Sequence, residues 1–333
     1  MLKALCSLHG VSGNENAVRD YIISRIAPYC NYSVDVLGSV IAFKKGKKAP
    51  KKRVMLCAHM DEVGFIITGI TDDGYLRFAP IGGMDPRVVL DRKVQIGEHF
   101  GVIGTKAVHL LTDEEKKKAP DFEQLYIDIG AENKEEAAAR VHLGDYACFC
   151  SAYTEFGNGF IKAKALDDRI GCMLLIELLQ SDLEFDTWFC FNVQEEVGLR
   201  GAACTAYSVQ PDVAVVLEAT TAADLDGCSG AERVCVLGDG PVVSFMDGRT
   251  VYTPSLYQLA FDVAKQNGIA CQTKTAIAGG NDAGAIQSSC AGVKVLAVSL
   301  PCRYIHSASS VVKSSDIDET RSLLTALLPK LYD

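Results

Sequence analysis

Two adjacent glutamates, Glu195 and Glu196, follow an apolar run in the segment VQEEVGLRGA, residues 193–202. Neighbouring carboxylates repel each other, and the repulsion is most costly where water is scarce. A chain folding for stability alone would rarely place such a pair directly after a buried strand. The doublet therefore indicates chemistry, in which one carboxylate binds a cation or moves a proton.

Other acidic and histidine side chains also follow apolar runs directly. They are His59 and Asp61 after VMLCA, Asp167 and Asp168 after IKAKAL, Glu218 after VAVVL, and His306 after LAVSLPCRYI. Each has an ordinary explanation by itself, such as an aspartate that caps a helix. Because ligands of α/β proteins bind at the carboxyl ends of strands, their joint placement on one predicted sheet edge favours a site.

The residue types in this set suit two zinc-like ions. Two histidines and three carboxylates are enough if one carboxylate bridges, so that each ion receives one histidine, one terminal carboxylate and half of the bridge. A shared water then completes the open coordination typical of catalytic zinc. A further carboxylate beside the ions could take a proton from this water and deliver it to a leaving group. Asp61 lies two residues after His59 and could fix the tautomer of that histidine.

The elements that position these residues form two patterns. From Gly159 onward, apolar strand-like runs alternate with helical segments, which predicts an α/β fold with a parallel or mixed sheet flanked by helices. Between Val63 and Asn158 the pattern changes to short alternating strands with turn signals, as in TDDGYLRFAPIGG. We therefore expect a discontinuous catalytic domain, residues 1–62 and 159–333, and a small β-rich domain inserted at residues 63–158.

Composition excludes several classes of protein. The chain has 333 residues and a formal net charge of −9, which disfavours binding to nucleic acid or to an anionic membrane. Its thirteen cysteines are odd in number and several lie in apolar stretches, so we expect free thiols in a reducing compartment. No run approaches the length of a membrane span, and no signal-type apolar region is present. These features predict a cytoplasmic protein.

The segments AHMDEVGF, ALDDRIG, VQEEVGLRGA and RYIHS, in this order and spacing, resemble the tetrahedral (TET) or glutamyl aminopeptidase family. This is the forty-second metallopeptidase family, whose members are also described as endoglucanase-like or cellulase M-like. The resemblance extends to GVSGNE near the N-terminus, to IGGMDPRVVLDRKVQI and to AGGNDAGAIQ, and so covers essentially the whole chain. It implies a zinc-peptidase-like catalytic domain. It also implies an inserted PDZ-like or barrel domain that forms dimers, which assemble into a tetrahedral dodecamer.

The resemblance also implies a role for individual residues. These are His59 as a ligand of the first metal, Asp167 as the bridge, Glu196 and His306 as ligands of the second metal, Glu195 as the general base, and Asp61 as the group that orients His59. The remaining ligand of the first metal is commonly an aspartate in this family, whereas this chain has Glu218, from which we expect altered metal affinity or preference. The residues after RYIHS usually include a proline and a glutamate, but here they read ASSVV.

The resulting prediction is an aminopeptidase that acts on short peptides. The free amino group would bind near one metal, and Glu195 would transfer a proton from the bridging water to the departing amine. Zinc is the expected metal, with cobalt and manganese as alternatives that accept the same ligands. Asp282, in the loop GGND, and Arg303 are candidates for contact with the substrate, although capping or structural roles fit them equally well.

Three alternatives fit parts of the pattern. An endoglucanase-like glycoside hydrolase would also use two carboxylates, but it would not need His59 and His306 at matching strand ends. Di-zinc carboxypeptidases and deacylases use a similar set of metal ligands, but they usually carry their insertion between later strands. A non-catalytic assembly protein on the same scaffold would be expected to lose Glu195 or a bridging ligand, and both are present. The sequence therefore favours an aminopeptidase over these three alternatives.

Overall fold

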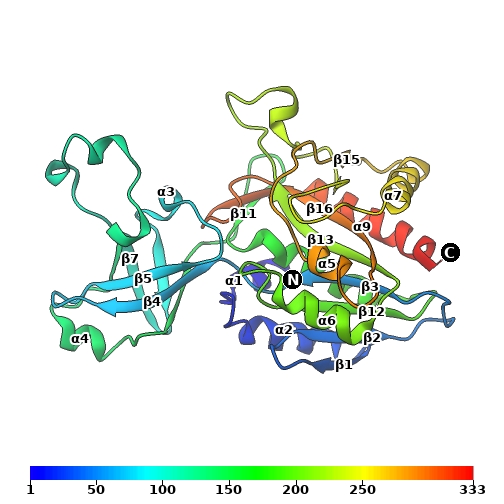
Figure 1. Cartoon of the computed structure of the whole chain (residues 1–333), viewed down its shortest axis with the longest axis horizontal. Helices are drawn as coiled ribbons and strands as arrows, with labels where there is room; N and C mark the ends of the chain where they lie inside the picture. Colours follow the sequence, from blue (N-terminus) through cyan, green and yellow to red (C-terminus); the bar gives the residue numbers. More distant parts are fainter. Residues whose placement is uncertain (333) are drawn as a thin grey trace.

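The computed structural model describes residues 1–332 and shows two lobes side by side (Figure 1). The large lobe is built on a mixed sheet flanked by helices, and the small lobe is a closed barrel of six strands. The predicted fold class, an α/β sheet with a β-rich unit inserted into the chain, is confirmed.

The main sheet has eight strands in the order β1-β2-β12-β3-β13-β16-β14-β15. Its four central strands, β12, β3, β13 and β16, run parallel, so their carboxyl ends meet at one edge of the sheet. The bounds are β1 Asn31–Val34, β2 Val40–Lys44, β3 Val54–His59, β12 Thr187–Asn192, β13 Val213–Thr221, β14 Val242–Val243, β15 Gln272–Thr273 and β16 Lys294–Cys302.

The central strands are mostly apolar, as expected of strands that are covered on both faces of the sheet. In β3, Val54, Leu56 and Ala58 face one core, while Met55 and Cys57 face the other. The first core is formed with helices α1 (Leu2–Ser7), α2 (Asn16–Ile26), α5 (Leu166–Gln180), α7 (Pro254–Asn267) and α9 (Ser314–Leu327). The second core is formed with α6 (Arg200–Val209) and α8 (Ala283–Gln287).

The barrel has its own hydrophobic core. The ring of Phe65 packs edge-on against Phe78 and Phe149, with ring centroids 5.0 and 5.2 Å apart. Closure of the barrel leaves none of its strands with an open edge. The strands, in their order around the barrel, are β4 Gly64–Ile70, β5 Leu76–Ile81, β8 Tyr126–Asp128, β7 His99–Gly104, β6 Lys93–Ile96 and β9 Tyr146–Phe149, and the short helices of this lobe are α3 Pro86–Val89 and α4 Lys134–Ala138.

A third, three-stranded sheet corrects one prediction. The IKAKAL segment was expected to end at the edge of the main sheet, but β11 (Phe160–Ala163) pairs antiparallel with β10 (Thr154–Phe156) and β17 (Ser310–Lys313) in a separate sheet. A short apolar run predicts a strand without specifying its partner, because pairing depends on distant segments. Asp167 therefore reaches the site from the start of α5 and not from a strand of the main sheet.

The cysteine side chains are free thiols, as expected, and those at Cys57, Cys172 and Cys190 are buried in the large lobe. Burial raises the pKa of these thiols, which keeps them protonated and unreactive. Among residues 1–332, no helix combines the length and the apolar character that crossing a membrane would require.

Candidate metal centre

The parallel register of the main sheet brings the first two site residues together. β3 ends at His59, and the pairing of Cys57 with Val216 places Glu218 of β13 beside that histidine. Nε2 of His59 lies 3.5 Å from Oε2 of Glu218. Two adjacent strands that end at the same level therefore position the first pair.

Asp167 joins this pair to a second histidine. Its backbone, with φ −83° and ψ 110°, is not helical although it lies in the first turn of α5, and its peptide bond to Asp168 is cis. Oδ1 of Asp167 lies 3.4 Å from Nε2 of His59, and Oδ2 lies 3.4 Å from Nε2 of His306. The two oxygens of one carboxylate thus face two different histidines, as expected of a bridging ligand.

The second histidine is oriented by the small lobe. Nδ1 of His306 lies 2.7 Å from the carbonyl oxygen of Gly83, which follows β5 of the barrel. A carbonyl oxygen can only accept, so Nδ1 carries a proton, and Nε2 is the nitrogen that could bind a cation. This nitrogen lies 3.3 Å from Oε2 of Glu196, which completes a second group of three.

The two groups, His59–Asp167–Glu218 and Asp167–Glu196–His306, fit divalent cations. In each group three ligand atoms lie within 4.8 Å of one another. Nε2 of His59 and Oε1 of Glu218 are buried and have no hydrogen-bond partner among the described residues, which is uncommon for buried polar atoms. Imidazole nitrogens and carboxylate oxygens that converge without donors between them are the ligand set of zinc and similar ions.

Asp61 connects one of these groups to the glutamate doublet. Asp61 is fully buried. Its Oδ1 lies 3.4 Å from Nδ1 of His59 and also accepts the backbone N–H of Glu195 at 3.0 Å. Oδ2 accepts the backbone N–H of Glu196 at 3.1 Å and the hydroxyl of Ser12 at 2.7 Å. Nδ1 of His59 also lies 3.2 Å from the backbone carbonyl oxygen of Asp61, so the predicted orienting role stays a prediction that both contacts allow. The contacts of Asp61 with the doublet have no signal in the sequence.

The electrostatics of the centre show a surplus of buried negative charge. Burial, reinforced by the nearby Glu218 carboxylate, raises the pKa of Glu195 well above its usual value. Burial raises the pKa of Glu196 to about 7, although the charge of His306 opposes the shift. Burial also opposes ionisation of Asp167, but its close contacts with His306 and His59 outweigh this effect and lower the pKa of its carboxyl. Bound cations would relieve the repulsion among these groups.

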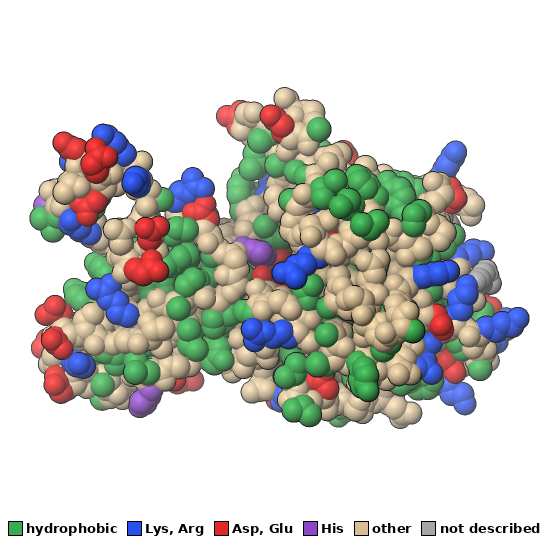
Figure 2. All heavy atoms as spheres, viewed as in Figure 1, with side chains coloured by type: hydrophobic (Ala, Val, Ile, Leu, Met, Phe, Trp, Pro, Cys, Tyr) green, Lys and Arg blue, Asp and Glu red, His purple; other side chains and the backbone are tan. Residues whose placement is uncertain are grey.

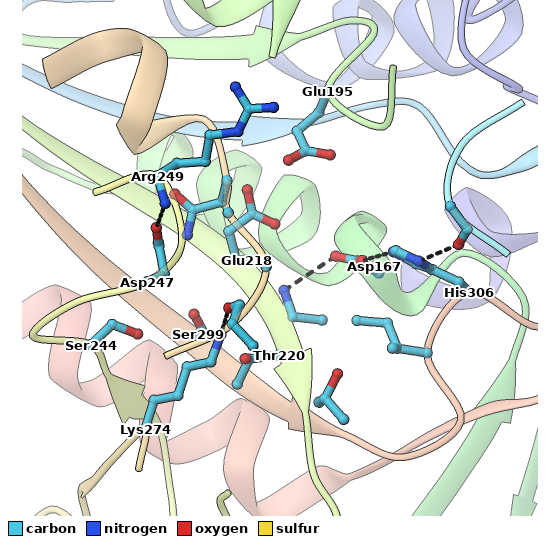
Figure 3. Close-up of a pocket in the computed structure, with 18 of the residues that line it drawn as sticks. Asp167, Glu195, Glu218, Thr220, Ser244, Asp247, Arg249, Lys274, Ser299 and His306 are labelled. Atoms are coloured by element: carbon cyan, nitrogen blue, oxygen red, sulfur yellow. Dashed lines mark hydrogen bonds and ion pairs between the residues drawn. The ribbon is translucent and has the colours of Figure 1, made fainter. Parts of the chain in front are cut away.

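A cavity of ≈ 610 Å³ opens directly over the two groups. Figure 2 shows a hollow between the lobes, with histidine and acidic side chains at its floor. In Figure 3, Glu195, Glu218, Asp167 and His306 lie along one side, while Arg249, Lys274 and Ser244 lie along the other. A cavity of this size can hold a small ligand whose reacting bond lies next to the metal ligands.

The two predicted substrate contacts do not line this cavity. Asp282 is fully buried, and its Oδ2 accepts from the side-chain amide of Asn192 at 2.8 Å. The guanidinium of Arg303 makes two hydrogen bonds, of 2.7 and 2.6 Å, to the carboxylate of Asp224. Both side chains are thus held by neighbours in the protein, and the structure does not support direct contact with a substrate.

Two positively charged side chains of the cavity wall were not identified from the sequence. Arg249 follows β14 and Lys274 follows β15, and each of these strands has only two residues. Such short strands give no alternating pattern, so nothing marked the residues after them as strand ends. The proximity of Arg249 to the loop GGND, whose Gly280 it contacts, also has no local sequence signal.

A buried ion network supports the centre from behind. Glu62 accepts from Nζ of Lys164 at 2.6 Å and from the guanidinium of Arg169 at 3.0 Å. Arg169 is 0% exposed and also donates to the carbonyl oxygens of Met60 and Leu5. Glu62 and Arg169 belong to the motifs AHMDE and ALDDRIG, so each motif supplies structural charges beside its metal-type residues.

An α/β sheet with histidines and carboxylates at its strand ends, joined to an inserted barrel, is the arrangement of a metallopeptidase. Residues 38–323 match the model of the M42 glutamyl aminopeptidase family, and the chain belongs to this family. It is therefore a hydrolase of the aminopeptidase class.

Relatives of known sequence or structure are similar to this chain over nearly their whole length. A protein described as a putative aminopeptidase from Acetivibrio thermocellus is 38% identical over 97% of this chain and 96% of its own. The TET1 peptidase of Pyrococcus horikoshii, described as able to assemble into a tetrahedron or a large octahedral shell, is 35% identical, with a TM-score of 0.87 over 98% of this chain and 97% of that one. A structure described as an endoglucanase from Thermotoga maritima is 37% identical, with a TM-score of 0.82 over 100% of this chain and 97% of that one.

Proposed function

We propose that this chain is a di-metal aminopeptidase that removes N-terminal residues from short peptides, with Glu195 as its general base. The observation that carries the proposal is the placement of Asp167, whose two oxygens face His59 and His306 separately. His59 and Glu218 would hold the first ion and Glu196 and His306 the second, with Asp167 shared between them. Zinc is the expected metal, and cobalt or manganese would suit the same ligands.

The chain's own groups supply orientation and proton transfer. When bound, the ions would polarise the scissile carbonyl and lower the pKa of the attacking water. Glu195 lines the cavity and would take a proton from this water, then deliver it to the nitrogen of the departing amine. Asp61 fixes the ring of His59 and the backbone of Glu195, while Gly83 fixes the ring of His306. The reacting groups are therefore held before a substrate arrives.

The position of the metal ligands in the cavity supports cleavage at the first residue of a peptide. The free terminal amino group would bind beside one metal, on the side of the cavity lined by Asp167, Glu196 and Glu218, which would place the first peptide bond next to Glu195. An N-acetylated peptide lacks this amino group and should bind poorly. The free thiols of the chain are those of a protein in a reducing compartment, which supports a cytoplasmic location.

We further propose that the inserted unit, residues 63–158, is a dimerisation domain and that dimers assemble into a tetrahedral dodecamer. The assemblies described for the TET1 peptidase of Pyrococcus horikoshii support this proposal. So do exposed apolar side chains on the barrel: Phe100 and Val102, on β7, are 51% and 48% exposed. Apolar side chains exposed side by side often mark an interface.

An endoglucanase-like activity is the second candidate because the Thermotoga maritima structure carries that description. A glycosidase needs two carboxyl groups that flank a sugar bond and does not need metal ligands. Here Glu196, Glu218 and Asp167 each face a histidine at 3.3 to 3.5 Å, which favours the peptidase.

One assay separates the two candidates. The purified chain is stripped with a chelator, supplied with Zn²⁺, Co²⁺ or Mn²⁺, and tested on acidic, basic and apolar aminoacyl-p-nitroanilides, on their N-acetylated counterparts and on a β-glucan. We expect metal-dependent release from the free-amine substrates alone. Hydrolysis of the β-glucan together with no release from any free-amine substrate would overturn the proposal.

A further inference from the structure

The loop between α1 and α2, residues 10–15 with the sequence GVSGNE, lies against the segment that follows β3. The backbone N–H of Glu62 donates to the carbonyl oxygen of Gly10 at 2.9 Å, and the N–H of Ser12 donates to that of Glu62 at 3.3 Å. Because Glu62 is itself held by Lys164, the loop is fixed to a rigid part of the lobe, next to Asp61.

Glu15 reaches from this loop to the turn that carries the glutamate doublet. Glu15 is only 5% exposed. Its Oε1 accepts the backbone N–H of Gly13 at 2.8 Å and the backbone N–H of Gln194 at 3.1 Å. Gln194 has a φ of +57°, a left-handed conformation that is unfavourable for a residue with a side chain. It directly precedes Glu195, so the bond from Glu15 restrains the turn at the point where Glu195 leaves it.

Ser12 restrains the same turn by a second route. Its hydroxyl donates to Oδ2 of Asp61 at 2.7 Å, and the same oxygen accepts the backbone N–H of Glu196. Ser12 is 5% exposed, and neither Ser12 nor Glu15 lines the cavity. Both side chains therefore act on the doublet through its backbone and cannot touch a substrate there.

We propose that Glu15 and Ser12 are positioning residues that hold the carboxylate of Glu195 in its working direction. The inference rests on the proposed role of Glu195 as general base. Glu15 contacts the turn only at the backbone N–H of Gln194, and Ser12 reaches it through Asp61, so both can change the placement of the base without belonging to the metal ligands or the cavity wall. A displacement of about 1 Å at a reacting group can lower turnover by about a hundredfold.

The first test compares Glu15→Ala with Glu15→Gln in the metal-loaded full chain. The alanine removes the acceptor for both N–H groups, whereas the glutamine keeps a carbonyl oxygen that can accept them. For Glu15→Ala we expect kcat to fall by about 10- to 100-fold, with KM and the number of bound metal ions unchanged. Glu15→Gln should restore most of the lost kcat. Asp186→Ala is a matched control: it removes a carboxylate that accepts the N–H of Gly46 at the opposite end of β12.

The second test places Glu15→Ala in a Glu195→Gln background. If Glu15 acts through Glu195, the double variant should be no slower than Glu195→Gln alone. A further loss in the double variant, a raised KM or a lower metal content would overturn the inference and assign Glu15 a general structural role. Full activity of Glu195→Gln by itself would instead contradict the proposed base. If Glu15→Ala fails to fold, Ser12→Ala in both backgrounds gives the same comparison, and an unchanged kcat in that variant would reject the inference.

Discussion

Asp167 is the residue on which the centre depends, because it is the only ligand common to both groups of three. The sequence predicted the residue types of the centre, since histidines and carboxylates after apolar runs stand out against their surroundings. It could not predict that Asp61 binds the backbone of Glu195 and Glu196, 134 and 135 residues away along the chain. Hydrogen bonds between distant loops leave no periodic pattern. For the same reason, nothing in the sequence showed that Asp282 is bonded to Asn192 beneath the site.

Glu195→Gln tests the proton transfer at this scale. The glutamine has nearly the same shape, but it cannot accept a proton from water, so turnover should fall by about 10²- to 10⁴-fold. The metal content should remain that of the unchanged chain, because Glu195 belongs to neither group of ligands. Steady-state kinetics and elemental analysis of the same sample measure both quantities. An active variant with unchanged metal content would remove Glu195 from the mechanism.

Among the elements, β3, β12 and β13 were predictable because a strand buried on both faces needs an unbroken apolar run. β11 was predicted as a strand but placed in the wrong sheet, and β14 and β15 are too short to give any pattern. The start of α5 shows why local rules have limits. Its first turn departs from helical geometry at Asp167 and Asp168, where contacts with the neighbouring strands outweigh helical preference.

Arg169→Met tests how strongly the buried network holds α5 against the end of β3. The substitution leaves Glu62 with one cation fewer, leaves the carbonyl oxygen of Met60 without a donor, and leaves that of Leu5 with only the N–H of Leu8. We expect the free energy of unfolding to fall by about 3–5 kcal/mol, measured by urea denaturation of the chelator-stripped chain. The exposed Arg25→Met is the control and should change stability by less than about 0.5 kcal/mol. Equal stabilities of the two variants would show that the network is dispensable.

Asp316, in the first turn of α9, gives a pH dependence of stability. Burial raises the pKa of its carboxyl from 3.8 to about 6, although the N–H groups of Gly238 and Gly240 favour the ionised form. The folded state therefore binds more protons than the unfolded state between about pH 4 and pH 6, and this contribution to stability is lost as the pH rises through that window. Asp316→Asn cannot titrate. Relative to this variant, the unchanged chain should lose Tm from pH 4 to pH 6, and a constant difference in Tm would contradict the assignment.

In the whole molecule, the barrel is part of the centre because the carbonyl oxygen of Gly83, which follows β5, contacts Nδ1 of His306 in the large lobe. The change from strand–helix alternation to short alternating strands predicted a β-rich insertion. It did not predict this contact, since the relative placement of two units depends on side chains at their junction. The match of residues 38–323, which span both lobes, to one family explains why a site drawn from both lobes can be recognised from short motifs.

The exposed side chains of β7 test the proposed assembly. If Phe100 and Val102 lie in a dimer interface, Phe100→Glu combined with Val102→Glu should lower the mass measured by light scattering after size exclusion. Burial of two added charges in an apolar contact opposes association. The control is Val36→Glu, because Val36 is fully exposed on the large lobe. A dodecamer in the double variant would place the interface elsewhere, and a monomeric unchanged chain would contradict the assembly itself.

If two ions share Asp167, the number of metal ions bound per subunit depends on this one carboxylate. The chelator-stripped chain is reloaded with Zn²⁺, desalted and measured by elemental analysis beside His306→Ala and Asp167→Ala. We expect two ions per subunit in the unchanged chain, one in His306→Ala, and fewer than one in Asp167→Ala, because the aspartate serves both groups of ligands. A single ion in the unchanged chain, or one ion retained firmly in Asp167→Ala, would contradict a shared bridge.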